Sequence, residues 1–64
     1  MADVFGQELR DQLAQARVEL AAARAAQDED GVEAYRGRIT GLLRIAARHG
    51  VDLPHTAEEE AGDD

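Results

Sequence analysis

Apolar and small residues recur at alternating spacings of three and four along the first part of the chain. The positions are Gly6, Leu9, Leu13, Ala16, Leu20 and Ala23. This spacing places them on one face of an α-helix. The residues between them are mostly Ala, Gln, Glu and Arg, which are good helix formers. The pattern therefore predicts a first helix over about residues 4–27.

A second run with the same spacing follows an acidic break at residues 28–30. Its members are Val32, Tyr35, Ile39, Leu42, Ala46 and His49. Asp30 and Glu33 have the spacing of a capping box, and acidic side chains favour a helix N-terminus. We therefore predict a turn over 28–30 and a second helix over about 31–49.

The end of the second helix also has a sequence signature. Gly50 followed by Val51 is typical of a Schellman ending, and Leu53-Pro54 prevents the helix from continuing. Residues 50–54 are then a C-terminal extension of the hairpin. From 55 to 64 the chain contains no large apolar residue and five acidic ones, which predicts a disordered acidic tail.

A turn of about three residues makes the two predicted helices antiparallel. If the turn is centred near residue 29, Leu20 lies level with Ile39 and Ala16 with Leu42. Small residues then face large ones, as interdigitated packing requires. The predicted fold class is all-α, a two-helix antiparallel coiled-coil hairpin. The alternative is one continuous helix, which Gly31 and the acidic break disfavour.

The apolar stripe on the second helix is wider than one seam requires, because Leu43 and Ile45 lie on its opposite flanks. A chain of 64 residues without Cys also has a small core and often needs a partner. We expect a homo-oligomer, most simply a dimer that forms a four-helix bundle. The alternative is a monomer with two exposed aliphatic residues. The candidate oligomer or partner face is Val32, Tyr35, Ile39, Leu42, Leu43 and Ile45.

Arginines recur every seven residues along one flank of the first helix. Arg10, Arg17 and Arg24, with Arg36 level on the second helix, form what we call the arginine edge. Neighbouring like charges cost free energy unless opposite charges compensate them. The compensating negative charge could come from a second subunit, an acidic protein partner or a bound anion. Alternatively, the alkyl stems simply cover the seam while the charges are solvated. On the opposite flank, Glu19 and Arg38 are placed to pair.

Composition removes several classes of function. The chain has seven Arg and fourteen Asp plus Glu, a net charge of −7, and no Lys, Ser or Cys. Disulfides, thiolate zinc sites and the commonest covalent nucleophiles are therefore absent. We expect no enzyme activity and no cofactor. His49, Asp52 and His55 could ligate a metal, but a helix end with Gly50 and Pro54 does not favour their convergence.

The charge and the lack of long apolar runs also limit partners and location. An acidic chain is a poor partner for nucleic acid, which draws on a basic surface. No apolar run approaches the 18 residues of a membrane span, and the start has no secretory signal pattern. We expect no membrane contact and a cytoplasmic location.

These observations predict a small cytoplasmic helical-hairpin protein that acts in protein-protein interaction, by self-association and by adaptor or regulatory binding. One alternative is a sensor that binds a small anionic ligand along the arginine edge. Another is an obligate subunit of a larger complex.

Overall fold

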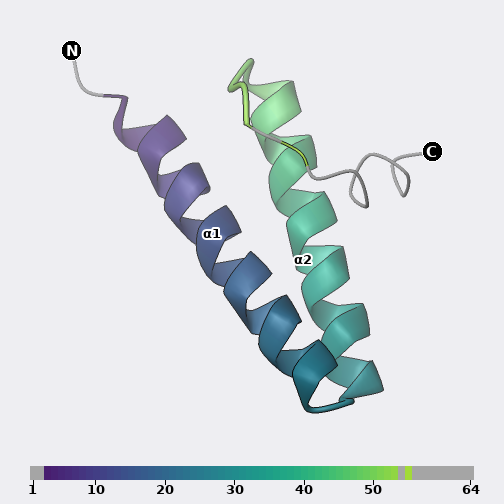
Figure 1. Ribbon diagram of the computed structural model, residues 1–64. Helices are drawn as coiled ribbons and strands as arrows, with labels where there is room; N and C mark the ends of the chain where they lie inside the picture. The colour runs from purple at the N-terminus through teal and green to yellow at the C-terminus, as the bar shows by residue number, and fades with distance from the viewer. Residues whose placement is uncertain (1–2, 54, 56–64) are drawn as a thin grey trace.

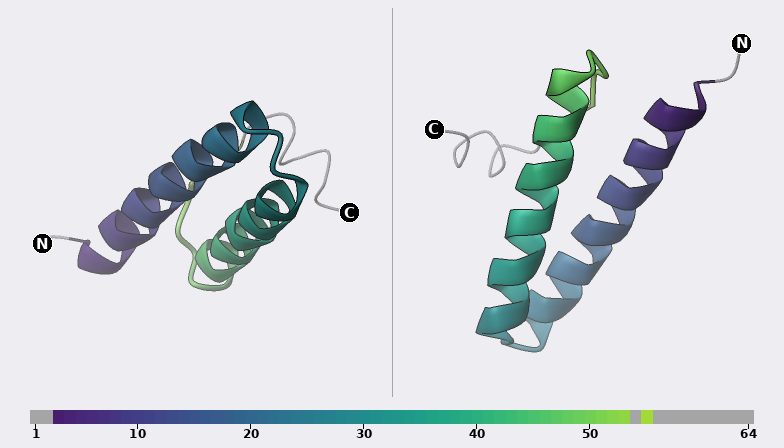
Figure 2. Two further views of the ribbon diagram at one scale, coloured as in Figure 1. Left: turned by 90° about the horizontal axis from the view of Figure 1, so that it is seen from below. Right: turned by 180° about the vertical axis from the view of Figure 1, so that it is seen from behind.

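Two packed antiparallel helices make up the regular secondary structure of the described chain. The computed structural model describes residues 3–53 and 55. Helix α1 spans Val4–Ala25 and helix α2 spans Glu29–Arg48. The helices lie closest at the turn and diverge toward the other end of the hairpin (Figures 1 and 2). We call that other end the open end. The predicted all-α hairpin is confirmed.

Both helices begin with the same local structure. The carboxylate of Asp3 accepts a hydrogen bond from the Gly6 backbone N–H at 2.9 Å. The carboxylate of Asp28 accepts one from the Gly31 backbone N–H at 3.1 Å. In each case an Asp side chain satisfies one of the N–H groups that a helix N-terminus leaves without a partner. The cap of α2 is thus Asp28 and not the predicted Asp30, and α2 begins two residues earlier than the sequence indicated.

The turn is short because Asp28 takes part in both helix ends. Its backbone N–H donates to the Ala23 carbonyl at 2.9 Å, and the Gln27 N–H donates to the Arg24 carbonyl at 3.1 Å. These two bonds form a Schellman motif, which requires a left-handed residue after the helix. Gln27 supplies it with φ 56°. The side chain of Asp28 then starts α2.

The end of α2 has the predicted Schellman geometry. Gly50 has φ 70°. The Val51 N–H donates to the Ala46 carbonyl at 2.8 Å, and the Gly50 N–H donates to the Ala47 carbonyl at 3.2 Å. Glycine adopts this left-handed conformation without the steric cost that a Cβ brings.

The core follows the predicted seam closely. The buried residues of α1 are Gly6, Leu9, Leu13, Ala16, Leu20 and Ala23, which are the six positions of the repeat. From α2 the hairpin buries Ile39, Leu42 and Ala46. Val32 and Tyr35 are half-buried against this core, whereas His49 is exposed.

The register is centred on Gln27 and not on residue 29, as the earlier start of α2 requires. The ring of Phe5 meets the ring of His49 edge-on, with centroids 5.0 Å apart. A turn centred near residue 29 would instead have placed His49 level with Leu9. The hydroxyl of Tyr35 likewise donates to Oε2 of Glu19 at 3.4 Å.

The segment after α2 is part of the core. It turns back at the open end and runs beside the helix pair (Figures 1 and 2). Leu53 is only 5% exposed and belongs to the main apolar cluster, and Val51 packs partly against it. Leu53 thus adds a third contribution to a core built from two helices.

Candidate interaction surfaces

An apolar patch lies at the open end of the hairpin. Phe5 is 46% exposed and Ile45 is 40% exposed. Ile45 precedes His49 by four residues on α2, so the two side chains are neighbours on one helix face. Because the Phe5 ring rests against His49, these residues join into one surface. We call Phe5, Ile45 and His49 the open-end patch. Two residues at this site, Phe5 and His49, lie outside the predicted oligomer face.

The six residues predicted to form an oligomer or partner face do not form one surface of the single chain. Ile39 and Leu42 are buried in the seam between α1 and α2. Val32, Tyr35 and Leu43 are half-buried against the core. Only Ile45 is a large exposed apolar residue. Leu43 packs against the core cluster, whose members include Leu53 from outside both helices.

A row of polar side chains bridges the helices on the flank that carries Glu19. In addition to the Tyr35–Glu19 bond, Nη2 of Arg38 donates to Oε1 of Gln12 at 3.5 Å. The amide of Gln12 also donates to Oε2 of Glu8 at 2.9 Å. Arg38 therefore bonds Gln12, and Glu19 bonds Tyr35, in place of the predicted Glu19–Arg38 pair. The two cross-helix bonds are long, and the Arg38–Gln12 bond is exposed, so they contribute little to stability.

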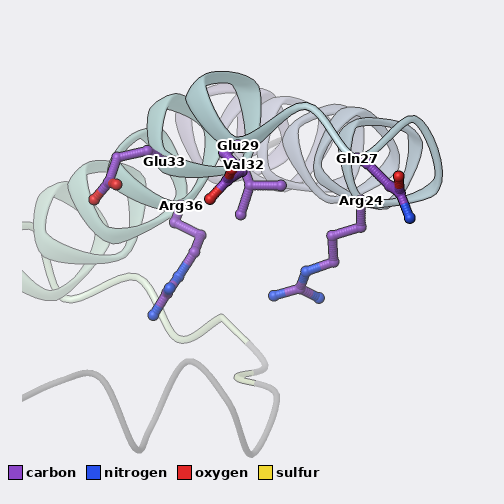
Figure 3. A pocket seen from close by; sticks show the side chains of 6 residues that line it. All are labelled: Arg24, Gln27, Glu29, Val32, Glu33 and Arg36. Carbon is purple, nitrogen blue, oxygen red and sulfur yellow. The ribbon is translucent and has the colours of Figure 1, made fainter.

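Two of the four residues of the arginine edge lie close together near the turn. Arg24 of α1 and Arg36 of α2 line one open pocket of about 320 Å³. The other lining residues are Gln27, Glu29, Val32 and Glu33. Figure 3 shows the two guanidinium groups extending to the same side of the hairpin, with the Val32 side chain between the two arginine side chains.

Arg10 and Arg17 lie farther along α1 and are not among the residues that line this pocket. None of Arg17, Arg24 and Arg36 is without an interaction partner in the structure. The lining contains two carboxylates as well as two guanidinium groups, so the charges within the pocket are nearly balanced. The pocket alone is thus a weak site for a small anion.

Within residues 3–53 and 55, no three His, Asp or Glu side chains are grouped as metal ligands would be. His49, Asp52 and His55 therefore do not converge. No helix in the described part of the chain is long and apolar enough to cross a membrane. The predicted disordered tail falls almost wholly on residues 56–64, which lie outside the described residues.

Comparison with protein-family models, curated proteins and solved structures gave no match for this chain.

Proposed function

We propose that this chain is a non-enzymatic helical-hairpin interaction protein whose first partner is a second copy of itself. The open-end patch carries this proposal. Phe5 and Ile45 expose large apolar side chains at the same end of the hairpin, and apolar surface removed from water stabilises an association. Two hairpins joined through this patch would form a four-helix bundle.

The composition of the core supports the same proposal. The described residues bury six large aliphatic side chains, which are Leu9, Leu13, Leu20, Ile39, Leu42 and Leu53. The remaining buried apolar residues are alanines, which remove less apolar surface from water. A core of this size leaves a small chain marginally stable, so burial in a second subunit is a direct source of further stability. In a two-fold symmetric dimer the same patch is contributed by both subunits, so one exposed residue adds apolar contact from each of them.

Replacing Ile45 by Ser tests the proposal, because the change removes one of the two large exposed apolar side chains of the patch. Ile45→Ser is expected to convert a dimer into a monomer that keeps its helical circular dichroism, since Ile45 is outside the core. Val18→Ser is the matched control. Val18 is 61% exposed and lies on the face of α1 away from the seam, so this variant should remain dimeric. The measurement is solution mass by light scattering across a dilution series.

A wild-type chain that is monomeric at every concentration would overturn the proposed self-association. So would an Ile45→Ser variant that keeps the dimer mass. Loss of the dimer in both variants would mean that the two substitutions act through general stability and not through the patch.

The second candidate is a sensor of a small anionic ligand. The convergence of Arg24 and Arg36 on one pocket favours it. It ranks below self-association because Glu29 and Glu33 share the lining and oppose a second negative charge there.

A further inference from the structure

We propose that the second copy docks on one continuous face of the hairpin, with its turn at the same end as the turn of the first copy. This inference rests on the proposed self-association and deepens it, because it specifies which side chains meet across the dimer. The face extends the open-end patch along the flank that carries Glu19. We call it the dimer face, and its members are Phe5, Glu8, Glu19, Arg38, Ile45 and Arg48.

Helix spacing makes this face continuous. Phe5, Gln12 and Glu19 follow one another at intervals of seven residues, so they lie on one line along α1. Arg38 and Ile45 are also seven residues apart and lie on one line along α2. The 3.5 Å hydrogen bond from Arg38 to Gln12 joins the two lines. The apolar patch and the polar row are therefore parts of one surface.

The two halves of the dimer face carry opposite charges. Its charged groups are Glu8 and Glu19 on α1, and Arg38 and Arg48 on α2. The two glutamates accept hydrogen bonds from an amide at 2.9 Å and from a phenol at 3.4 Å, which are neutral groups. Between residues 34 and 51 the chain contains four arginines and no acidic residue. The face is thus acidic along α1 and basic along α2.

A two-fold axis parallel to the helices matches these charges. Such an axis keeps both turns at one end and places α1 of each copy against α2 of the other. Within one hairpin, Phe5 is level with His49 and Glu19 is level with Tyr35. The second copy's α1 would have the same levels along α2 of the first.

This arrangement brings each glutamate to an arginine of the other copy. The second copy's Glu8 lies level with residue 46 and is therefore within one helical turn of Arg48. The second copy's Glu19 is likewise within one turn of Arg38. Complementary charges of this kind select an orientation more than they add affinity. The apolar contact of the open-end patches supplies the affinity.

A two-fold axis perpendicular to the helices does not fit the same face. It would place α1 against α1 and α2 against α2, so glutamates would oppose glutamates and arginines would oppose arginines. Overlap along the whole face would also bring the open-end patch against the end near Glu19, which is polar. The parallel axis instead joins Phe5 of one copy to the patch of the other. Charge and apolar contact therefore favour the same orientation.

Charge swaps test this arrangement in the full chain. The first variant is Glu8→Arg with Glu19→Arg, and the second is Arg38→Glu with Arg48→Glu. Each variant alone brings like charges together in the proposed dimer, so its dimer Kd should rise about tenfold or more. An equal mixture restores opposite charges at every contact and should form a heterodimer with a Kd near that of the wild type. Light scattering across a dilution series measures mass, and circular dichroism follows helix content.

The matched control for net charge is Arg10→Glu with Arg44→Glu. Both arginines are exposed and lie outside the dimer face, and the change in net charge equals that of the second variant. The control should keep the wild-type Kd. A rise in its Kd as large as that of the second variant would assign the effect to net charge and would overturn the proposal.

Failure of this inference is distinguishable from failure of the proposed self-association. A wild-type chain that is monomeric at every concentration would overturn both. A wild-type dimer whose Kd is unchanged in the two swap variants would overturn the proposed orientation alone. A mixture that forms no heterodimer would do the same.

A spin label near the turn measures the orientation directly. Because the sequence has no Cys, Ala25→Cys provides one attachment point per chain, at an exposed position in the last turn of α1. Turns at the same end leave the two labels without an offset along the helix axes. Opposite ends would offset them by about 40 Å, at 1.5 Å per residue. Double electron–electron resonance should give a distance clearly below that offset, and a distance equal to it or longer would overturn the proposal.

Discussion

Gln27 adopts a left-handed backbone conformation at the turn, which costs free energy because the residue has a Cβ. Within the described residues it is the one non-glycine with a positive φ. A Cβ in the left-handed region meets the following carbonyl oxygen, at a cost of about 1–2 kcal/mol. The turn tolerates this because the Gln27 and Asp28 N–H groups satisfy two carbonyls of α1.

Gln27→Gly should therefore stabilise the hairpin. The substitution removes the strain but gives the unfolded chain more freedom, so the expected net gain is about 1 kcal/mol. Urea denaturation followed by circular dichroism measures it. Gly50→Ala is the mirror control, since Gly50 has φ 70°, and it should lower stability by a similar amount. A neutral or destabilising Gln27→Gly would contradict the strain argument.

At this scale the sequence predicted one helix end and missed the other. Gly50 is the residue that a left-handed position favours, and its role could be predicted directly. Gln27 is not such a residue, and three acidic residues in a row offered several possible caps. The sequence favoured Asp30 because of Glu33. The structure uses Asp28, because the carbonyls of α1 and the first N–H groups of α2 can both be satisfied there.

Helix α2 contains two glycines, Gly37 and Gly41, at positions where the surroundings do not require a glycine. A Cβ added at Gly37 or Gly41 would meet no atom within 4 Å. A Cβ at Gly31 would lie 2.5 Å from Oδ2 of Asp28 and 3.2 Å from the Cβ of Ala23. The three glycines thus differ in the space around them, although all lie in the same helix.

Alanine substitutions at these glycines should have opposite signs. Gly37→Ala and Gly41→Ala should each stabilise the hairpin by about 1 kcal/mol, because alanine is the better helix former. Gly31→Ala should lower stability, because it displaces the capping carboxylate, which is worth about 1 kcal/mol. Thermal melts of the three variants compare them. A stabilising Gly31→Ala would show that the cap is not needed.

At the scale of elements, the seam was the most predictable feature. All six α1 positions of the repeat are buried, because burial on a helix follows its period directly. The surface was less predictable. The sequence places Leu43 and Ile45 on the two flanks of one stripe, but only Ile45 is exposed. A helical wheel does not include a segment that returns to the core after the helix has ended.

At the scale of the whole molecule, Leu53 extends the core beyond the two packed helices. Through it, the segment after α2 becomes part of the folded hairpin. Leu53→Ala should lower stability by about 2–3 kcal/mol, in the range of buried leucine truncations. Val4→Ala removes an apolar side chain that is 74% exposed and should change stability by less than about 0.5 kcal/mol. Urea midpoints at fixed protein concentration measure both. Equal effects would mean that Leu53 is not part of the core in solution.

The candidate surfaces could be predicted only in part from the sequence. The heptad spacing of Arg10, Arg17 and Arg24 predicts a common flank, and the structure adds that Arg24 and Arg36 share a pocket. The open-end patch was missed because it depends on register. Centring the turn two residues earlier brings Phe5 to His49, and a repeat of three and four residues does not determine that offset.

Asp28 also determines where the folded chain can begin to open. Because its backbone closes α1 and its side chain starts α2, neither helix can fray at the turn without releasing the other. Local unfolding therefore starts at the opposite end, where the helices diverge (Figure 1). The first contacts to separate are those of Phe5, His49 and Leu53. The surface proposed for self-association thus lies at the least protected end of the molecule.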